Sequence, residues 1–261
     1  MSLNNSVKSL TSGKIKTIFK ISVGSGSTMK EAQMHIKGLQ KTTLLDYPGH
    51  VACTVFTGGC NFRCPFCHNA SLVLAPNTVD NIPEKEFFDF LLKRKGILDG
   101  VCITGGEPLL QNDIIPFLEH IHQLGFKIKL DTNGSFPQRL EKIISLGLVD
   151  HIAMDIKNSP SKYSVTAGAE CFDQVHESIN LIMNSGVSYE FRTTVVRELH
   201  EEEDLEAIAR LIPNAEQYFL QAFKDSDELI GEGFSAYSDE EMEQLLSVVL
   251  KYVPSARIRG K

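Results

Sequence analysis

The chain has 261 residues, a length typical of one large α/β domain or of two smaller domains. Its 26 Lys and Arg residues and 33 Asp and Glu residues give a net charge of -7, which argues against binding to nucleic acid or to an anionic membrane surface. No apolar run approaches the ~18 residues that a membrane-spanning helix needs, so we expect a soluble protein.

The first 33 residues differ in composition from the rest of the chain. They contain seven Ser residues, five Lys residues and a Gly-Ser-Gly-Ser stretch at 24–27, with no sustained apolar period. Such a composition is typical of a flexible segment. We therefore expect residues 1–33 to be a flexible N-terminal extension and residues 34–261 to form the folded domain.

From about residue 35 onward, short β-branched runs alternate with amphipathic helical patterns. The expected strands are 51–57, 100–104, 126–132, 151–157, 188–196 and 217–223. The expected helices are 83–95, 113–124, 137–146, 172–185, 201–211 and 238–252. Six β/α units form either an open doubly wound sheet or an incomplete barrel, since the closed barrel has eight units. In both architectures, sites form at the carboxyl ends of the strands.

Three of the six cysteines, Cys60, Cys64 and Cys67, lie within eight consecutive positions. An odd number of thiols in one short loop does not make a disulfide framework, and it favours a metal site in a reducing, cytoplasmic compartment. Zinc commonly takes two separated pairs of ligands, and no second pair follows here. Three thiolates can instead hold three irons of a 4Fe-4S cluster and leave the fourth iron open for chemistry.

Glycine and charged residues follow the expected strands at their carboxyl ends. Gly105 and Gly106 have no Cβ, so their backbone can approach a ligand closely. Asp155 and Lys157 alternate in phase along a strand, which places both side chains on one face. Lys157 can neutralise a carboxylate, and so can Arg192, whose guanidinium offers two parallel hydrogen bonds. The position of these residues indicates a functional site.

The segment 60–67 reads CNFRCPFC, and its spacing resembles the cluster motif of the radical S-adenosylmethionine (radical SAM) superfamily. The sequence TGGEP at 104–108 resembles the GGE motif of the same superfamily. The sequences LDTNG at 130–134 and MDIK at 154–157 resemble segments of enzymes that activate glycyl radical enzymes. Residues 38–69 are similar to the activating proteins of anaerobic ribonucleoside-triphosphate reductases. The resemblance extends over residues 34–255.

This resemblance implies an α/β fold, the incomplete (β/α)6 radical SAM barrel, that binds a 4Fe-4S cluster and S-adenosylmethionine (SAM). The implied cluster ligands are Cys60, Cys64 and Cys67. The implied cofactor-binding residues are Phe66 near the adenine, Gly105, Gly106 and Glu107 at the methionyl amino group, Asp131 and Asp155, and Lys157 and Arg192 at the methionyl carboxylate. A monovalent cation is implied at Asp131, Thr132, Met154 and Asp155.

The implied activity is reductive cleavage of SAM to a 5'-deoxyadenosyl radical, which generates a glycyl radical on a partner enzyme. The implied partner is anaerobic ribonucleoside-triphosphate reductase. The other cysteines, Cys53, Cys102 and Cys171, do not form a second cluster motif. We therefore expect the electron to come from an external donor such as flavodoxin or ferredoxin.

One stretch departs from the family pattern. A pyruvate formate-lyase activating enzyme has a histidine after its sixth strand that meets the cofactor, whereas residues 220–224 here read LQAFK, so the nucleoside contacts stay undetermined. His68 follows the last cysteine of the loop directly, and we expect a structural role for it rather than metal ligation. The other histidines, including His120, His122 and His200, show no ligand spacing, and we expect them on the surface.

Three alternatives remain open at the level of the sequence. The chain could activate another glycyl radical enzyme such as pyruvate formate-lyase, or it could catalyse a radical reaction on a small molecule. It could also be a non-catalytic zinc-binding interaction module. Metal analysis separates this last alternative, because iron with acid-labile sulfide supports an enzyme and tightly held zinc excludes one.

Overall fold

The computed structural model describes residues 34–226 and 228–260. The segment 1–33, for which the sequence predicts a flexible extension, lies outside the described residues. No helix in the described part of the chain is long and apolar enough to cross a bilayer.

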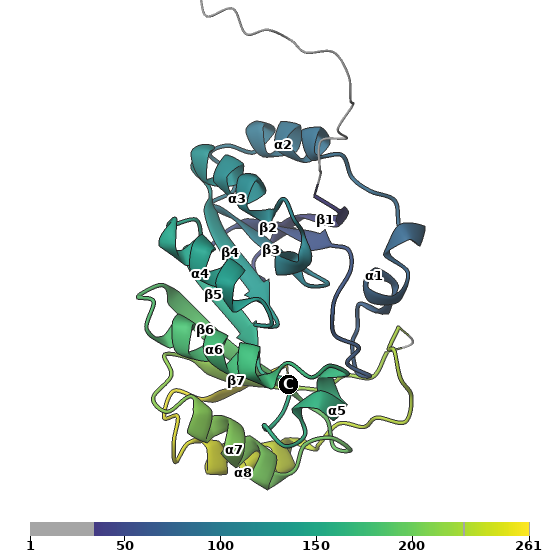
Figure 1. The fold of residues 1–261 in the computed structure, drawn as a ribbon, viewed down its shortest axis with the longest axis vertical. Coiled ribbons are helices and arrows are strands. Elements are labelled where there is room, and N and C mark those ends of the chain that lie inside the picture. The colour runs from purple at the N-terminus through teal and green to yellow at the C-terminus, as the bar shows by residue number, and fades with distance from the viewer. Residues whose placement is uncertain (1–33, 227, 261) are drawn as a thin grey trace, which may run out of the picture. The chain divides into compact units, whose positions relative to one another are not determined.

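One eight-stranded sheet carries the fold, and its strands lie side by side in chain order (Figure 1). β1 pairs antiparallel with β2, and every later strand pairs in parallel with the one before it. Because β1 and β8 are the two edges, the sheet is an incomplete barrel and does not close. The strands are β1 (Ile36–Thr43), β2 (Ala52–Thr57), β3 (Gly100–Gly105), β4 (Lys127–Thr132), β5 (His151–Asp155), β6 (Ser188–Val195), β7 (Tyr218–Ala222) and β8 (Arg257–Arg259).

Most of the helices that connect the parallel strands lie along one face of the sheet, whereas α1 and α5 lie apart from that layer (Figure 1). The helices are α1 (Ala70–Leu74), α2 (Glu84–Lys93), α3 (Ile114–Gln123), α4 (Pro137–Ser145), α5 (Tyr163–Ala167), α6 (Phe172–Met183), α7 (Glu202–Leu211) and α8 (Asp239–Val249). Two short 3-10 helices, η1 (Pro76–Thr78) and η2 (Pro108–Leu110), follow α1 and β3.

The alternation that the sequence predicted is confirmed. Each of the six expected strands and six expected helices is present, with ends within three residues of the expected ones. In α3, Ile114, Leu118 and Ile121 share the buried face. The left-handed Gly125 follows this helix, as the sequence indicates.

Two strands and two short helices were missed by the sequence analysis. β1 is an edge strand in which most side chains are half-buried or exposed, so it shows no clear apolar alternation. β8 has three residues, and α1 and α5 have five residues each. Segments this short give no periodic signal along the sequence.

The strands have one apolar face and one polar face near the carboxyl end of the sheet. Along β4, Ile128 and Leu130 are fully buried in the hydrophobic core. Because successive side chains point to opposite faces, Lys129 and Asp131 share the other face of the same strand. This alternation brings charged side chains into the interior of the barrel.

The loop after β3 packs directly on the loop after β2. The Gly106 amide donates to the carbonyl of Thr57 at 2.9 Å, and the Glu107 amide donates to the carbonyl of Gly59 at 2.8 Å. A Cβ on Gly106 would lie 1.9 Å from the Gly59 carbonyl oxygen. Gly105 has a φ of +112°, and a Cβ there would lie 2.3 Å from the Thr57 amide nitrogen. Both glycines are therefore required by backbone packing between the two loops.

This contact predicts a large penalty for the substitution Gly106→Ala. The added methyl group collides with a backbone carbonyl that cannot rotate away, so we expect a loss of more than about 3 kcal/mol in the free energy of unfolding. Urea unfolding followed by circular dichroism measures it. Gly147→Ala is the matched control, because Gly147 has a positive φ but no neighbour within 4 Å of its added Cβ. This control should lose about 1–2 kcal/mol, and equal losses in both variants would contradict the packing argument.

Candidate active site

A cavity of about 300 Å³ lies at the carboxyl ends of the parallel strands. It is lined by most of the residues that the sequence singled out, namely Cys60, Cys64, Phe66, Cys67, Gly105, Gly106, Asp131, Thr132, Asp155, Lys157 and Arg192. Glu107 and Met154 are fully buried and do not line it. Asn69, Asn133, Thr194 and Gln221 also line the cavity, and the sequence analysis assigned no role in the site to any of them.

The cysteine loop is held by two buried aromatic rings and by backbone hydrogen bonds. Phe62 and Phe66 are buried within the hydrophobic core. The Arg63 amide donates to the Ala167 carbonyl at 2.8 Å, and the Gly231 amide donates to the Pro65 carbonyl at 2.7 Å. These contacts come from segments far away in the sequence, so the folded chain fixes the loop that presents the three thiols.

The loop after β4 supports the first cysteine. The side-chain amide of Asn133 donates to Asn61 Oδ1 at 3.0 Å and lies 3.8 Å from the Cys60 sulfur. Asn61 in turn donates to Ser135 Oγ at 2.9 Å. The loops after β2 and β4 are therefore joined by an amide network beside Cys60.

Burial changes the acidity of the thiols. It raises the pKa of both Cys60 and Cys64 to about 11, and the nearby charge of Lys157 opposes this rise in each case. All six cysteines of the chain are free thiols. Because a metal binds the thiolate and not the thiol, loading metal onto this loop releases protons.

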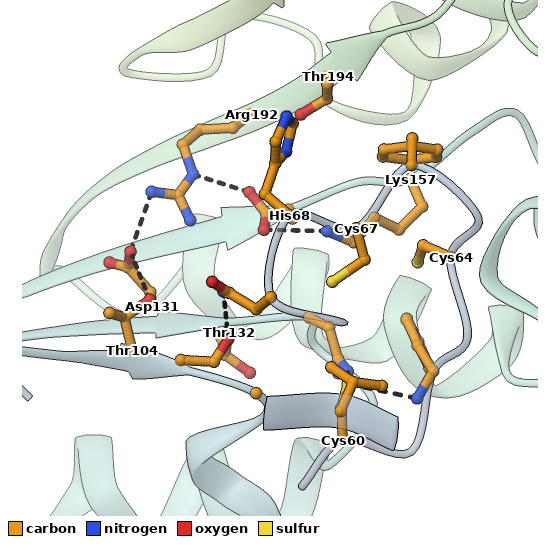
Figure 2. Close-up of a pocket in the computed structure, with 18 of the residues that line it drawn as sticks. Cys60, Cys64, Cys67, His68, Thr104, Asp131, Thr132, Lys157, Arg192 and Thr194 are labelled. Carbon is orange, nitrogen blue, oxygen red and sulfur yellow. Dashed lines mark hydrogen bonds and ion pairs between the residues drawn. The ribbon is translucent and has the colours of Figure 1, made fainter. Parts of the chain in front are cut away.

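Asp155 and Arg192 are the centre of a cluster of charges on the wall of the cavity. Arg192 Nε donates to Asp155 Oδ1 at 2.7 Å, and Arg192 Nη1 donates to Asp131 Oδ2 at 3.1 Å. Lys157 Nζ donates to Asp155 Oδ2 at 3.0 Å, which confirms that Asp155 and Lys157 share a face. Figure 2 shows the Arg192 guanidinium beside Asp131, with Lys157 and the three cysteines farther from Asp131 than Arg192 is.

The charges in this cluster stabilise one another. Burial alone raises the pKa of Asp155, but the charges of Arg192 and Lys157 outweigh burial and hold that pKa well below its ordinary value. Burial lowers the pKa of Lys157, and the opposing charge of Asp155 outweighs it and raises the pKa. The carboxylates and the cations are thus all ionised at neutral pH.

Three members of the charge cluster, Lys129, Glu190 and Arg259, were missed by the sequence analysis. Lys129 contacts Asp131 Oδ1, and its side chain is 2 % exposed. Glu190 lies 3.8 Å from Arg192 Nη1 and accepts two hydrogen bonds from Arg259. Lys129 and Asp131 are two residues apart on one strand, like Asp155 and Lys157, so the same spacing rule would have identified Lys129.

Glu107 is a support for the strand ends rather than a wall of the cavity. Its carboxylate accepts hydrogen bonds from the Leu109 amide at 3.0 Å, the Thr132 hydroxyl at 2.8 Å and the Asn133 amide at 2.7 Å. Burial raises the pKa of Glu107 to about 7, against the lowering effect of these three donors. Its side chain joins the loop after β3 to the loop after β4.

The expectation that His200 lies on the surface was wrong. His200 is fully buried, accepts a hydrogen bond from the Val196 amide at Nδ1, and has Nε2 at 2.8 Å from the Lys157 carbonyl. The acidic run that follows it suggested a solvated segment, but the Phe66 ring and the Lys157 carbonyl contact the imidazole, and the Tyr237 hydroxyl donates to the His200 carbonyl. His120 and His122 are exposed, as expected.

Two ring-bearing residues of the cavity, Phe66 and His68, contact residues that are distant in the sequence. The ring of Phe66 meets that of His200 edge to face, with centroids 6.4 Å apart. His68 Nε2 lies 2.7 Å from the Lys224 carbonyl oxygen, so this ring is tied to the segment after β7. This contact is consistent with the structural role expected for His68.

Comparison with known proteins decides the family. Residues 54–212 match the family described as the radical SAM superfamily. The chain belongs to the radical SAM superfamily. A candidate glycyl-radical enzyme activating enzyme of Methanocaldococcus jannaschii is 32% identical over 236 residues, which cover 86% of this chain and 95% of that protein. A protein of Saccharolobus solfataricus named as a probable GTP 3',8-cyclase is 30% identical over 136 residues, which cover 50% of this chain and 42% of that protein.

Solved structures share the radical SAM fold. A domain of the pyruvate-formate lyase-activating enzyme from Bacteroides vulgatus superposes with a TM-score of 0.53 at 18% identity, covering 62% of this chain and 99% of that one. SuiB from Streptococcus suis superposes with a TM-score of 0.63 at 16% identity, covering 78% of this chain and 47% of that one. At these identities the likeness concerns the fold alone.

The donor set fits the cofactors that radical SAM membership implies, a 4Fe-4S cluster and SAM. Three free thiols on one loop line a single cavity, which suits a cluster with three cysteine ligands. Lys157 and Arg192 line the same cavity and suit the carboxylate of an amino acid moiety. This chain is therefore a radical SAM enzyme whose cavity has the chemistry to hold both groups.

The raised pKa of Glu107 predicts a pH-dependent stability. Folding raises this pKa from 4.5 to about 7, so between these values the native state holds a proton that the unfolded state has lost. The contribution of Glu107 to the free energy of unfolding therefore falls as the pH rises through this range, by up to about 1.4 kcal/mol per pH unit. The substitution Glu107→Gln removes this dependence.

Urea unfolding of wild type and Glu107→Gln at pH 5 and pH 8 measures the effect. The free energy of unfolding of the variant minus that of wild type should be larger at pH 8 than at pH 5. Glu203→Gln on the exposed surface of α7 is the control, and its difference from wild type should stay constant. A constant difference for Glu107→Gln as well would contradict the assigned pKa.

Proposed function

We propose that this chain activates a glycyl radical enzyme, and that the partner is an anaerobic ribonucleoside-triphosphate reductase. The observation that carries the proposal is one cavity lined by three thiols from a single loop and by the cations Lys157 and Arg192. The relative from M. jannaschii, which matches over 95% of its length, supports an activating role. Residues 38–69 support the choice of partner by their similarity to its activating proteins.

When bound, the 4Fe-4S cluster would supply the electron for reductive cleavage of SAM, which in turn would allow abstraction of a hydrogen atom from a glycine Cα of the partner. In our proposal, Cys60, Cys64 and Cys67 hold the cluster. The protein then contributes binding, orientation and exclusion of water.

Lys157 and Arg192 have donors to spare for the methionyl carboxylate. Lys157 Nζ gives one hydrogen bond, to Asp155, and an ammonium group has three donors. Arg192 Nη2 donates to no residue in the described part of the chain, while Nε and Nη1 hold the two aspartates. These free donors line the same cavity as the cysteine loop, so a carboxylate can dock beside the thiols.

The proposal assigns the nucleoside to the part of the cavity beside Phe66. Phe66 offers an apolar ring edge there for the adenine. Gln221, on β7, offers a polar group in the stretch where the pyruvate formate-lyase activating enzyme has a histidine, and Thr194, on β6, offers another. Gly105 and Gly106 present backbone groups to the methionyl amino group, and Glu107 acts by holding their loop.

We propose an external one-electron donor, a flavodoxin or a ferredoxin. Cys53 and Cys102 are fully buried on β2 and β3, and Cys171 precedes α6. These three positions give no second three-cysteine loop, which argues for an electron from outside the chain.

The test of the partner is an anaerobic activation assay. The protein is reconstituted with ferrous ion and sulfide, then mixed with SAM, a reductant and the candidate reductase, and electron paramagnetic resonance is recorded. We expect a glycyl radical signal that disappears when the glycine of the reductase is replaced by alanine. A signal with pyruvate formate-lyase alone would transfer the proposal to that partner.

The relatives named as cyclases favour a second candidate, a radical reaction on a nucleotide. The relative from S. solfataricus matches 50% of this chain, whereas the relative from M. jannaschii matches 86% of it. Incubation with GTP in place of the reductase tests this candidate, and we expect the GTP to remain unchanged.

We expect the removal of one cluster ligand to abolish the cleavage of SAM completely. Cys64→Ala should abolish assembly of the cluster and cleavage of SAM, because two cysteines of the loop cannot hold the three irons. Iron and sulfide content and the release of 5'-deoxyadenosine are the measurements. Cys171→Ala is the matched control, since this cysteine lies outside the loop, and it should retain both. Retention of iron and of cleavage in Cys64→Ala would refute the assignment.

Removal of the Lys157 ammonium should affect SAM and spare the cluster. Lys157→Met should weaken SAM binding at least about tenfold, because a charge-assisted hydrogen bond to the carboxylate is lost. Equilibrium dialysis of radiolabelled SAM with the reconstituted protein measures the binding, and iron analysis is the internal control. Loss of iron together with SAM would show that Lys157 supports the loop instead.

A further inference from the structure

Lys129 is a fully buried ammonium group inside the barrel. Its side chain is 2 % exposed, and it contacts Asp131 Oδ1. The other oxygen of Asp131 accepts from Arg192 Nη1 at 3.1 Å and from the Thr104 hydroxyl at 3.3 Å. A buried ammonium is tolerated only where it is paired, so Lys129 and Asp131 depend on each other.

The charge cluster carries one more positive than negative charge. Lys129, Lys157, Arg192 and Arg259 are opposed by Asp131, Asp155 and Glu190. Without Lys129 the cluster would be neutral. The methionyl moiety of SAM carries a carboxylate, and the net positive charge of the cluster favours that group.

A dissolved monovalent cation would need the oxygens that Lys129 and Arg192 already use. Hard cations of this kind bind carboxylate and carbonyl oxygens. Both oxygens of Asp131 have cationic partners, and so do both oxygens of Asp155. The cation that the sequence suggests at Asp131, Thr132, Met154 and Asp155 therefore competes with side chains of the protein itself.

We propose that Lys129 is a resident cation of the SAM site, a positioning residue that holds Asp131 against Arg192 and makes SAM binding independent of added potassium or sodium. The inference rests on the proposed function in assuming that SAM occupies the cavity. One part of the inference does not require SAM. It is that Lys129 takes the place of a dissolved cation at Asp131, and it applies to the protein without cofactor.

The test compares wild type, Lys129→Met and Lys127→Met in potassium chloride, sodium chloride and choline chloride at equal ionic strength. Lys127 is the matched control, because it lies on the same strand with an exposed side chain. Choline is too large to enter a site built for a small cation. The first readout is the dissociation constant of SAM for the reconstituted protein, and the second is the melting temperature of the cofactor-free protein.

We expect wild type and Lys127→Met to bind SAM with constants that agree within about twofold in the three salts. Lys129→Met should bind about tenfold more weakly in choline chloride and recover in potassium or sodium chloride. Without cofactor, Lys129→Met should melt roughly 2–4 °C higher in potassium or sodium chloride than in choline chloride. Wild type should melt at one temperature in all three salts.

Two results would overturn the proposal. One is a wild type that needs potassium or sodium to bind SAM. The other is a Lys129→Met protein whose dissociation constant for SAM and whose melting temperature are the same in all three salts. If Lys129→Met does not fold, Lys129→Gln replaces it, and Lys129→Arg, which keeps the charge, should behave like wild type. If wild type binds no SAM in any salt, the proposed function fails, while the melting temperatures of the cofactor-free proteins still decide the role of Lys129.

Discussion

The rest of the site depends on one interaction, the pair of salt bridges that the Arg192 guanidinium forms with Asp131 and Asp155. Each of these groups would be costly to bury alone, and each is stabilised because its neighbours carry the opposite charge. The network joins β4, β5 and β6 across the barrel and sets the position of Lys157 beside the cysteine loop. Loss of one member would leave an unpaired charge in the interior.

A second constraint connects this charge cluster to the thiols. Gly105 and Gly106 bring the strand end of β3 onto the loop that leads to Cys60, with a separation that excludes a Cβ. Glu107 then binds the end of β4 through Thr132 and Asn133, and Asn133 reaches back to Asn61 beside Cys60. The thiol loop and the strand end that carries Asp131 are therefore joined by one continuous set of backbone and side-chain contacts.

The sequence was sufficient for the parts of the site that depend on local spacing. The three cysteines lie in one loop, and Asp155 and Lys157 alternate along one strand, so their neighbours in space are also neighbours in the chain. The same rule applied to Lys129 and Asp131 would have revealed a third pair. His200 was misjudged because it packs against the loop after β5 and the ring of Phe66, and nothing in its local sequence indicates these distant contacts. Glu107 belonged to a motif, but its three donors come from the folded chain.

The sequence by itself determined the alternation of strands and helices, the family, and the thiols of the cysteine loop, because hydrophobic period and ligand spacing are properties of short segments. Only the tertiary structure decided which charges meet. Arg192 is 37 residues from Asp155 and 61 from Asp131, and their contact follows from the parallel register of neighbouring strands. The edge strands β1 and β8 were likewise decided by pairing with a neighbour, since their own residues carry too weak a pattern to specify them.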